Sequence, residues 1–484
     1  MFALRTDLNP HVVVIGGGLA GLVAAREVVR GDPGARVTVL EATDRFGGKL
    51  RLESVAGHQV DVGAEAMLAV RAEGVDLVHD LGAGSDLVTP ATTSASIWSR
   101  GALYAVPRAT LMGVPAVGAE VSGLLTVEEA ARAEAEVDWP TRAVADDVSV
   151  GDYVGARLGS AVVDRLVEPL LGGVYAGRAG ELSLAATMPA LWQAARAGES
   201  LRTVASRVLG AGSAPGSGRP MFAGIRGGMG RLPELLRADL TGGEFGARVW
   251  LRENTIARAL VHHDEGFAVL VGPTTDEEWL EADAVVVATP APAAARLLTA
   301  VAPRGARALA AIPTASSAVV TMAMPRAGMP ALPGSGFLVP GVDGHLIKGA
   351  TFSSAKWAWT DALSSELLFV RASVGRTGEE SALHAADADL VAVCVGELGE
   401  ALGHRLPAPA DSQVQRWGGG LPQYVVGHLD RIAAARTAVA AVPGLELAGA
   451  AYEGVGIPAV IASATTAGRE TVQAVRRLRR TEGE

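Results

Sequence analysis

Glycines near the N-terminus are spaced in a way that suits the binding of a pyrophosphate. The apolar run His11–Ile15 leads directly into Gly16, Gly18 and Gly21. Gly16 would permit a tight turn, Gly18 would let the backbone approach a diphosphate, and Gly21 would let a helix pack closely on the strand. The helix that follows would present unpaired N–H groups and the positive end of its dipole. This pattern predicts an anion-binding turn.

The acid that follows the next predicted strand identifies the kind of ligand. Residues 36–40 read as a strand, and Glu41 lies twenty residues after Gly21. There a carboxylate can accept hydrogen bonds from a ribose 2′-hydroxyl, and it would repel the 2′-phosphate of NADP. A glycine triplet alone could be only a turn. With strand, helix and acid in place, the segment predicts a Rossmann-type dinucleotide-binding unit.

A second pair of glycines favours FAD over NAD. Arg45, Gly47 and Gly48 follow the acid at once. Adjacent glycines allow a second close backbone approach, and the guanidinium suits a diphosphate. The alternative is an ordinary surface turn. An NAD-binding unit would normally continue here into another strand and helix, so we expect FAD.

The last part of the chain is expected to return to the same cofactor. Residues 443–449 read as a short strand that ends in Gly449, residues 454–458 as a glycine loop, and residues 459–477 as a helix. A glycine-rich loop that opens a helix offers N–H groups to an electron-accepting ring. The alternative is a plain strand, loop and helix.

Other elements must hold these two ends together. Residues 107–209 are expected to be mainly helical, and the small-residue stretch 210–218 reads as a linker. Strands are expected at 248–252, 267–271 and 283–290, the last buried on both faces. Residues 292–417 read as a separate α+β lobe with strands at 318–324 and 367–373. The apolar stretch 109–127 contains Pro115 and Glu120, so it is a poor membrane span.

Composition restricts the function. The formal charge of −10 argues against a nucleic-acid partner. The single cysteine, Cys394, excludes an internal disulfide, and we expect it to be a small buried apolar residue in a reducing compartment. No signal peptide is expected because a strand begins near residue 11, so a cytoplasmic location is predicted. The nine histidines form no metal-like cluster, and no metal site is expected.

Over nearly its full length the chain resembles the porphyrinogen oxidases of haem biosynthesis, within the flavin-dependent amine oxidase superfamily. Their bacterial coproporphyrinogen III oxidase branch is the most similar. Besides the glycine turns, the segments that carry the resemblance are residues 61–65, 168–177, 227–232, 351–357, 421–428 and 454–458.

The resemblance implies a fold and a set of domains. The fold class would be α/β plus α+β, with a discontinuous Rossmann-type FAD-binding domain, a mixed-sheet substrate domain and a helical lobe. The FAD-binding domain would comprise residues 1–80, 221–290 and 420–484. The helical lobe would comprise residues 90–210, and the substrate domain residues 291–419.

The resemblance also implies roles for individual residues. Besides the residues already named, the cofactor would be held by Val249, through its backbone at the adenine, and by Gly449, Val455, Gly456 and Ile457. The substrate would be bound by Arg71, Gly173, Ala176 and Lys356. The alternatives are a solvated surface arginine for Arg71 and simple packing beside Trp357 for Lys356.

Three positions depart from the pattern of the family. Arg178 and Ala459 stand where relatives often have aspartate, and Ala450 stands where an asparagine is usual. Side-chain contacts to the flavin from positions 450 and 459 are therefore not expected, and only backbone contacts are carried over.

The chemistry implied is a six-electron oxidation of coproporphyrinogen III to coproporphyrin III, with O2 reduced to H2O2. No catalytic side chain is expected, because the flavin would accept hydride and the protein would supply orientation and carboxylate anchors. Peripheral contact with a membrane and transient contact with the next haem-pathway enzyme are further expectations. The alternatives are a protoporphyrinogen IX oxidase, an amine oxidase or desaturase of the same superfamily, and a non-catalytic binder like the GDP-dissociation inhibitors.

Overall fold

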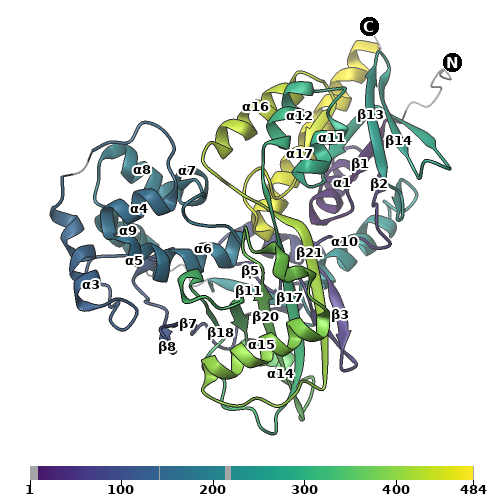
Figure 1. The fold of residues 1–484 in the computed structure, drawn as a ribbon. Helices are drawn as coiled ribbons and strands as arrows, with labels where there is room; N and C mark the ends of the chain where they lie inside the picture. Colours follow the sequence, from purple (N-terminus) through teal and green to yellow (C-terminus); the bar gives the residue numbers. More distant parts are fainter. Residues whose placement is uncertain (1–8, 141, 213–219, 483–484) are drawn as a thin grey trace.

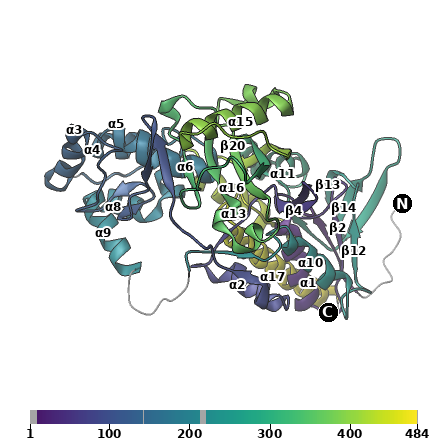
Figure 2. The same cartoon turned by 90° about the horizontal axis from the view of Figure 1, so that it is seen from below.

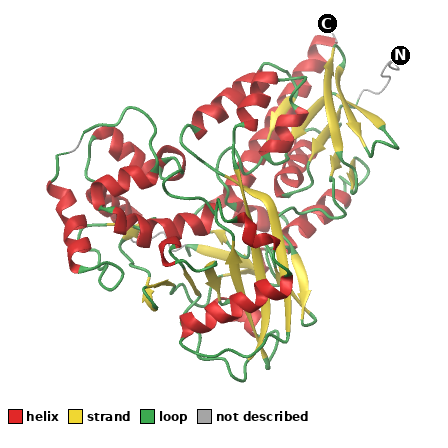
Figure 3. Ribbon diagram, viewed as in Figure 1, coloured by secondary structure: helices red, strands yellow, loops and turns green. Residues whose placement is uncertain are grey.

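The computed structural model describes residues 9–140, 142–212 and 220–482, and these form three units. Figure 1 shows a helical lobe on one side, a large sheet with a covering helix below, and a mixed unit where the two ends of the chain meet. Figure 3 shows that strands are concentrated in the last two units. The expected fold class is confirmed.

The first unit contains a five-stranded sheet in which every pairing is parallel. Its order is β12-β2-β1-β16-β22. These strands are β1 (His11–Ile15), β2 (Arg36–Leu40), β12 (Val249–Arg252), β16 (Ala284–Val287) and β22 (Leu445–Leu447). The strands come from three distant parts of the chain, and the strand expected within 283–290 is buried on both faces, as predicted.

Alternate residues of the central strand pack into different cores, because successive side chains of a strand point to opposite faces. Val14 packs against helices on one face, whereas Val13 packs on the other face. The first face is covered by α1 (Leu19–Gly31), α10 (Arg231–Thr241) and α17 (Ile457–Glu482). In Figure 2 these helices lie side by side with α2 (Ala72–Asp80).

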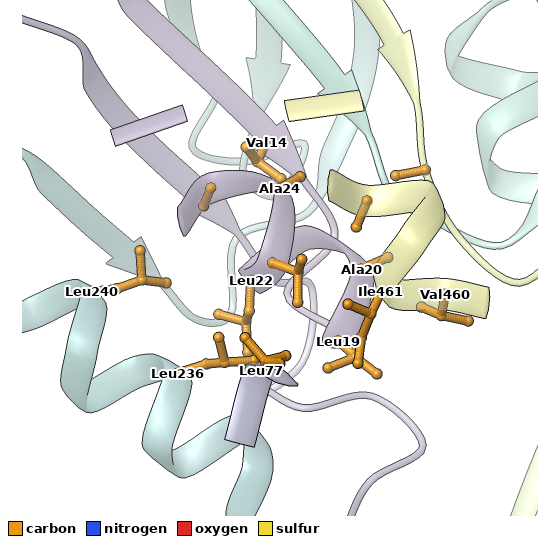
Figure 4. Packing of buried hydrophobic residues seen from close by; sticks show 14 of the residues in the cluster. Val14, Leu19, Ala20, Leu22, Ala24, Leu77, Leu236, Leu240, Val460 and Ile461 are labelled. Carbon is orange, nitrogen blue, oxygen red and sulfur yellow. The ribbon is translucent and has the colours of Figure 1, made fainter. Parts of the chain in front are cut away.

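Helix α1 is the centre of that core. Figure 4 shows Leu22 of α1 near Leu236 of α10 and Leu77 of α2, and Leu19 near Ile461 of α17. The opposite face is covered by α11 (Ala291–Leu297), α12 (Pro303–Ala310), α16 (His428–Ala440) and an antiparallel sheet of β13 (Ala257–His263), β14 (Gly266–Val271) and β15 (Glu278–Ala282).

The second unit is a seven-stranded mixed sheet of order β21-β17-β20-β19-β18-β7-β8. Its strands are β7 (Ser96–Ser99), β8 (Ala102–Ala105), β17 (Thr314–Pro325), β18 (Gly336–Leu338), β19 (Ile347–Thr351), β20 (Leu367–Val374) and β21 (Asp411–Pro422). Strands β7 and β8 were expected in the helical lobe. They belong to this sheet because β7 pairs with β18, far away in sequence.

One face of this sheet is covered by α15 (Asp387–Leu402), which buries Cys394 fully, as expected. Short elements complete the unit: η4 (Gly341–Asp343), α13 (Ser353–Lys356), α14 (Ala358–Asp361) and η5 (Glu380–His384). Between this unit and the first lie β3 (Leu52–Val55), β4 (His58–Asp61), β5 (Met67–Leu68), η1 (Gly84–Asp86), β6 (Leu87–Val88) and β11 (Phe222–Ile225).

The third unit is the helical lobe. It comprises β9 (Thr110–Leu111), β10 (Val114–Pro115), α3 (Val127–Glu134), η2 (Ala135–Asp138), α4 (Val150–Leu158), α5 (Ser160–Val162), η3 (Val163–Val167), α6 (Glu168–Tyr175), α7 (Leu184–Thr187), α8 (Pro189–Ala197) and α9 (Leu201–Gly212). The first residues of the expected linker thus belong to α9, and 213–218 lie outside the described residues. No helix in the described ranges is long and apolar enough to cross a membrane.

A buried ion pair joins the helices of this lobe. The carboxylate of Glu136 has no exposed surface and accepts hydrogen bonds from Arg157 Nε at 2.8 Å, Ser200 Oγ at 2.6 Å and the Leu201 N–H at 2.9 Å. These partners lie on α4, at the start of α9 and before it. The Glu136 carboxylate therefore fixes how η2, α4 and α9 pack against one another.

Candidate cofactor and substrate site

The first glycine turn has the shape that a diphosphate turn requires. Gly16 has a φ of +110°, a conformation that favours glycine. An added Cβ on Gly21 would lie 1.8 Å from the carbonyl oxygen of Gly16. Any larger residue at position 21 would therefore push α1 away from the turn. Gly18 precedes the first residue of α1 as its N-cap, and its side chain position is open.

The two glycine motifs lie against each other. The Gly47 N–H donates to the Gly17 carbonyl at 2.9 Å, and Gly18 forms a parallel bridge with Gly47. An added Cβ on Gly18 would meet only the Cα of Gly48, at 3.8 Å. Both backbones therefore border one open space at the N-terminus of α1. This is the cradle that two glycine turns around a single diphosphate would form.

Charged groups flank this cradle. The Glu41 carboxylate accepts hydrogen bonds from the Gly17 N–H at 3.0 Å and from Thr43 N and Oγ1 at 2.9 and 2.8 Å. Arg45 donates to the carbonyl oxygens of Phe46 and Gly48. Burial, and after it the nearby Arg51 charge, lower the pKa of Arg45. An anion in the cradle would oppose both effects, because it stabilises the charged form of Arg45.

Lys49 is a cation that sequence reasoning did not single out. Burial lowers the pKa of its ammonium, and this group forms no ion pair or hydrogen bond within the described part of the chain. An added Cβ on Gly420 would lie 3.5 Å from Lys49 Cε, so the side chain extends to the end of β21. The signal that could have found it is its place directly after the second glycine pair.

The C-terminal segment reaches the same edge of the sheet. β22 ends at Leu447, and Gly449 follows with a φ of +135° and no atom within 4 Å of an added Cβ. The loop then enters α17 at Ile457. Because parallel strands end at one edge, Gly449 and the first glycine turn lie on the same side of the sheet. Val455 packs against the helical lobe, whereas an added Cβ on Gly456 would meet only Pro458.

Val249 lies elsewhere. It is the first residue of β12 and pairs with Val37, near the start of β2, so it lies toward the opposite end of the strands from Glu41. The structure instead brings the residues after β12 to that acid, since the Thr255 N–H donates to the Glu41 carbonyl at 2.8 Å. Val249 therefore lies away from Glu41, and its contact with the adenine stays a prediction.

The residues present fit FAD. Two glycine turns leave an open cradle, an acid stands where a ribose would lie, and the cations Arg45 and Lys49 stand beside it. The structure brings together Gly16, Gly18, Gly21, Glu41, Arg45, Gly47, Gly48, Gly449 and Ile457 along one edge of the parallel sheet.

Of the residues expected to bind substrate, the two cations are already paired. Arg71 is exposed, precedes α2 as its N-cap and donates to Glu73 Oε1. Lys356 Nζ donates to Glu65 Oε1 at 2.8 Å and lies 5.2 Å from the Trp357 ring centroid. To bind a substrate carboxylate, Arg71 and Lys356 would each have to share a charge that is already paired with a glutamate.

Glu65 is the centre of a buried network that the sequence did not reveal. Its carboxylate accepts hydrogen bonds from Lys356 Nζ, Ser353 Oγ and Arg371 Nη1, each at 2.8 Å. Burial alone would raise its pKa, but the charges of Lys356 and Arg371 outweigh burial and hold the pKa of Glu65 below its usual value. The network connects the segment after β4 to the unit built on the seven-stranded mixed sheet.

Asp61 lies next to this network and is the last residue of β4, rather than part of a turn. Burial raises its pKa to about 7, although its carboxylate accepts hydrogen bonds from the Met229 and Gly230 N–H groups at 2.8 and 2.9 Å. Its role is structural, since it holds the loop before α10.

The small residues expected to line the substrate cavity join α6 to the substrate sheet. An added Cβ on Gly173 would lie 3.3 Å from Leu338 Cδ2. The carbonyl of Ala176 accepts hydrogen bonds from Thr377 N at 2.9 Å and Thr377 Oγ1 at 3.0 Å. Ala176 ends α6 in the left-handed conformation, with a φ of +54°. Both residues therefore lie where the helical lobe meets the sheet.

The three departures from the family pattern have structural roles. Arg178 donates to the Thr377 carbonyl at 2.8 Å and pairs with Glu379. The Ala450 carbonyl accepts a hydrogen bond from Tyr424 Oη at 2.5 Å. An added Cβ on Gly454 would lie 2.9 Å from the Ala459 Cβ, so a small residue at 459 packs against the glycine loop.

The fold and the cradle define a dinucleotide-binding protein, and comparison identifies which kind. The family model for flavin containing amine oxidoreductases matches residues 19–475. The chain belongs to this family, and flavin is its cofactor, as expected.

The relatives agree with the resemblance seen in the sequence. A Mycobacterium tuberculosis protein named coproporphyrinogen III oxidase is 36% identical over 96% of this chain and 97% of its own length. A Bacillus subtilis protein of the same name is 31% identical over 94% and 96%. A Macaca fascicularis protein named protoporphyrinogen oxidase is 29% identical over 92% and 95%.

Solved structures extend the comparison. A protein from Exiguobacterium sp., provisionally assigned as a protoporphyrinogen oxidase, has a TM-score of 0.82 and 30% identity and covers 97% of this chain and 100% of its own. Cyclohexylamine oxidase from Brevibacterium oxydans has a TM-score of 0.67 with 15% identity, covering 97% and 99%. The second likeness shows a shared fold alone.

Proposed function

We propose that the chain is an FAD-dependent oxidase that converts coproporphyrinogen III into coproporphyrin III in haem biosynthesis. The observation that carries the proposal is similarity along almost the whole chain to proteins of that name, at 31–36% identity. The glycine cradle supports it because it offers the cofactor a complete diphosphate site. As in the sequence-based prediction, six electrons leave the substrate and three O2 become three H2O2.

The chain's own residues would bind, orient and exclude water. A bound flavin would supply a hydride acceptor for the saturated carbons of the tetrapyrrole and a route for the electrons to O2. Gly18 and Gly48 would hold the diphosphate through backbone N–H groups, with Arg45 and Lys49 balancing its charge. Gly173 and Ala176 would leave room for a flat macrocycle. Arg71 and Lys356 would meet propionates.

Two alternatives are less well supported. Amine oxidases usually frame the flavin with an aromatic pair, and the C-terminal segment has only Tyr452 where such a pair would be sought. This ring is buried among the helices α11, α12 and α16. A non-catalytic binder would have no need of the cations beside the glycine cradle. Protoporphyrinogen IX is the main rival substrate, because one relative and one solved structure are named for its oxidation.

The test compares coproporphyrinogen III with protoporphyrinogen IX on the purified yellow protein. Loss of visible flavin absorbance without oxygen, then porphyrin fluorescence and H2O2 with oxygen, should be faster with the tetracarboxylate. Faster turnover of the dicarboxylate would move the enzyme to the protoporphyrinogen step. Absence of bleaching with either would reject the proposal, and bleaching by amines would replace it.

We also propose a cytoplasmic protein that contacts membranes and the next haem-pathway enzyme only transiently. Exposed apolar side chains on the helical lobe, Val117, Val127 and Trp139, support such contacts. Sedimentation with anionic vesicles should remove a fraction of the protein from solution. Replacing Val127 with serine should reduce that fraction without changing the flavin content.

A further inference from the structure

The lysines of this chain are few and are not at its surface. Three lysines stand against thirty-nine arginines, so this chain almost always uses arginine where it needs a cation. Lys49 lies beside the cofactor cradle, and Lys356 is paired with Glu65. Lys348, the remaining lysine, is only 7% exposed and belongs to neither site.

The surroundings of Lys348 leave its charge without a counterion. It occupies a bulge of β19, between Ile347 and Gly349. Its ammonium forms no hydrogen bond or ion pair within the ranges that the structure describes. The Glu397 carboxylate accepts hydrogen bonds from the N–H groups of Leu346 and Ile347. Burial, followed by the like charge of Arg376, lowers the pKa of Lys348 to about 8.

The neighbouring charges do not neutralise it. Arg376 donates to the carbonyl oxygens of His345, Val339 and Ile347 at 2.9, 3.1 and 3.1 Å, which fixes its guanidinium in place. Its own counterion is Glu379, whose Oε2 lies 3.6 Å from Arg376 Nη1. Glu168, at the start of α6, accepts a hydrogen bond from the Ala179 N–H at 2.6 Å. Burial raises the pKa of Glu168, against the opposing hydrogen bond from Ala179 and the charges of Arg178 and Arg376.

Lys348 lies in the wall that is expected to face the substrate. β18 and β19 both contact α6, the helix that contains Gly173. Leu338, which lies against Gly173, pairs with Gly349, the residue after Lys348. Thr377, the residue after Arg376, binds the Ala176 carbonyl. The backbone of Lys348 thus lies one residue from the Leu338–Gly349 pair that packs against Gly173, and Arg376 lies one residue from the contact with Ala176.

We propose that Lys348 determines specificity by binding one propionate of a tetracarboxylate tetrapyrrole. This inference rests on the function proposed above. A carboxylate would give the buried ammonium the charged partner that it lacks, whereas a vinyl group at the same place would leave it bare. Arg71 and Lys356 already share their charges with Glu73 and Glu65, so Lys348 is the cation most dependent on substrate.

The choice of lysine also fits this role. A lysine ammonium is a compact charge at the end of a flexible stem, whereas arginine presents a broad planar group. A chain that otherwise uses arginine retains lysine here, in a narrow bulge beside an existing guanidinium. We therefore expect Lys348→Arg to keep the positive charge but to fit the space around residue 348 less well.

The experiment compares Lys348→Met and Lys348→Arg with Arg405→Met, which removes the same charge from an exposed loop after α15. For Lys348→Met we expect KM for coproporphyrinogen III to rise about tenfold or more, with kcat within about twofold, because a ground-state contact is lost. KM for protoporphyrinogen IX should change little. Lys348→Arg should give an intermediate value, and Arg405→Met should match the wild type.

Two further readouts separate binding from folding. Fluorescence titration should show weaker binding of coproporphyrin III to Lys348→Met at unchanged flavin content. The thermal midpoint of Lys348→Met should not fall, since an unpaired buried charge has been removed. A purely structural lysine would instead lower the midpoint and affect both substrates alike, which would overturn the inference. Should Lys348→Met not fold, Lys348→Arg and Lys348→Gln carry the same comparison.

The outcomes also distinguish this inference from the proposed function. A wild-type protein that oxidises neither porphyrinogen and binds no coproporphyrin III rejects both. A wild-type protein that prefers coproporphyrinogen III, together with a Lys348→Met variant that keeps the same preference, rejects the role of Lys348 alone.

Discussion

At the scale of single residues, buried charges do most to join the units. Glu65 is held by Lys356 of α13 and Arg371 of β20, and Glu136 is held by Arg157 within the helical lobe. Removing one member of a buried pair is costly because the other charge is left without a partner. Surface pairs such as Arg207 with Glu199 contribute much less.

We expect Glu65→Gln to lower the free energy of unfolding by about 3 kcal/mol, by leaving Lys356 and Arg371 uncompensated. Denaturant titration at pH 7 measures this value. Glu199→Gln is the matched control and should stay within about 0.5 kcal/mol of the wild type. Equal losses in the two variants would contradict the central role of Glu65.

The pH dependence of stability should follow from the same carboxylate. The pKa of Glu65 is held below its unfolded value of 4.5, so its contribution is present above that pH and is lost as the pH falls further. Asp61 has the opposite sign, because its raised pKa of about 7 gives stability below pH 3.8 that is lost as the pH rises through 7. Denaturation curves from pH 7 to 3 should show less acid loss in Glu65→Gln than in wild type.

Sequence reasoning at this scale found residues whose role depends on neighbours along the chain. Gly16, Gly21 and Glu41 could be placed because a turn, a helix and a strand follow one another directly. The partner of Lys356 could not be predicted, since Glu65 is far away in sequence. The sequence could not show that Val249 lies at the end of β12 away from Glu41, because the alignment of β12 with β2 is not a local property.

At the scale of elements, the two glycine turns form one cradle. Gly18 has an extended conformation that alanine can adopt, and an added Cβ would meet only Gly48 Cα at 3.8 Å. The fold should therefore tolerate a methyl group there. A diphosphate that must approach the backbone at Gly18 would be obstructed by this methyl group.

Gly18→Ala should thus fold normally and bind FAD about tenfold or more weakly, since the methyl group occupies the space of the diphosphate. The ratio of flavin to protein absorbance after purification, and titration of the apoprotein with FAD, measure the effect. Gly396→Ala, in an open position of α15, is the control and should keep full flavin content. A fully loaded Gly18→Ala protein would show that the cradle is not at Gly18.

The elements themselves were largely predictable because their hydrophobic patterns are local. The buried run of β16, the strands β12 and β14 and the last helix all lie close to their expected positions, whereas β13 was not expected. The hairpin β7–β8 was assigned to the wrong unit, because its partner β18 follows more than two hundred residues later. Pairing between distant strands leaves no mark in a local pattern.

At the scale of the whole molecule, the first and last helices pack as neighbours. α1 and α17 make close contact, and an added Cβ on Gly468 would lie 2.6 Å from Glu27 Cβ and 2.8 Å from the Ala24 carbonyl. Gly468 therefore sets how closely α17 can approach α1. This close packing holds the Gly449 loop beside the first glycine turn, at the same edge of the sheet.

Gly468→Leu should destabilise the protein by about 1–3 kcal/mol and reduce flavin retention, because overpacking moves α17 away from α1. Thermal unfolding and flavin content measure both effects. Gly396→Leu, where nothing lies within 4 Å of an added Cβ, should change neither by much. Unchanged retention in Gly468→Leu would mean that α17 contributes little to the cofactor site.

The order of the strands in the parallel sheet has a consequence for biosynthesis. β1 and β2 leave the ribosome long before β22 and α17, which complete the same cofactor edge. Flavin can therefore be captured firmly only after α17 has emerged, so a chain that stops before β22 would emerge colourless.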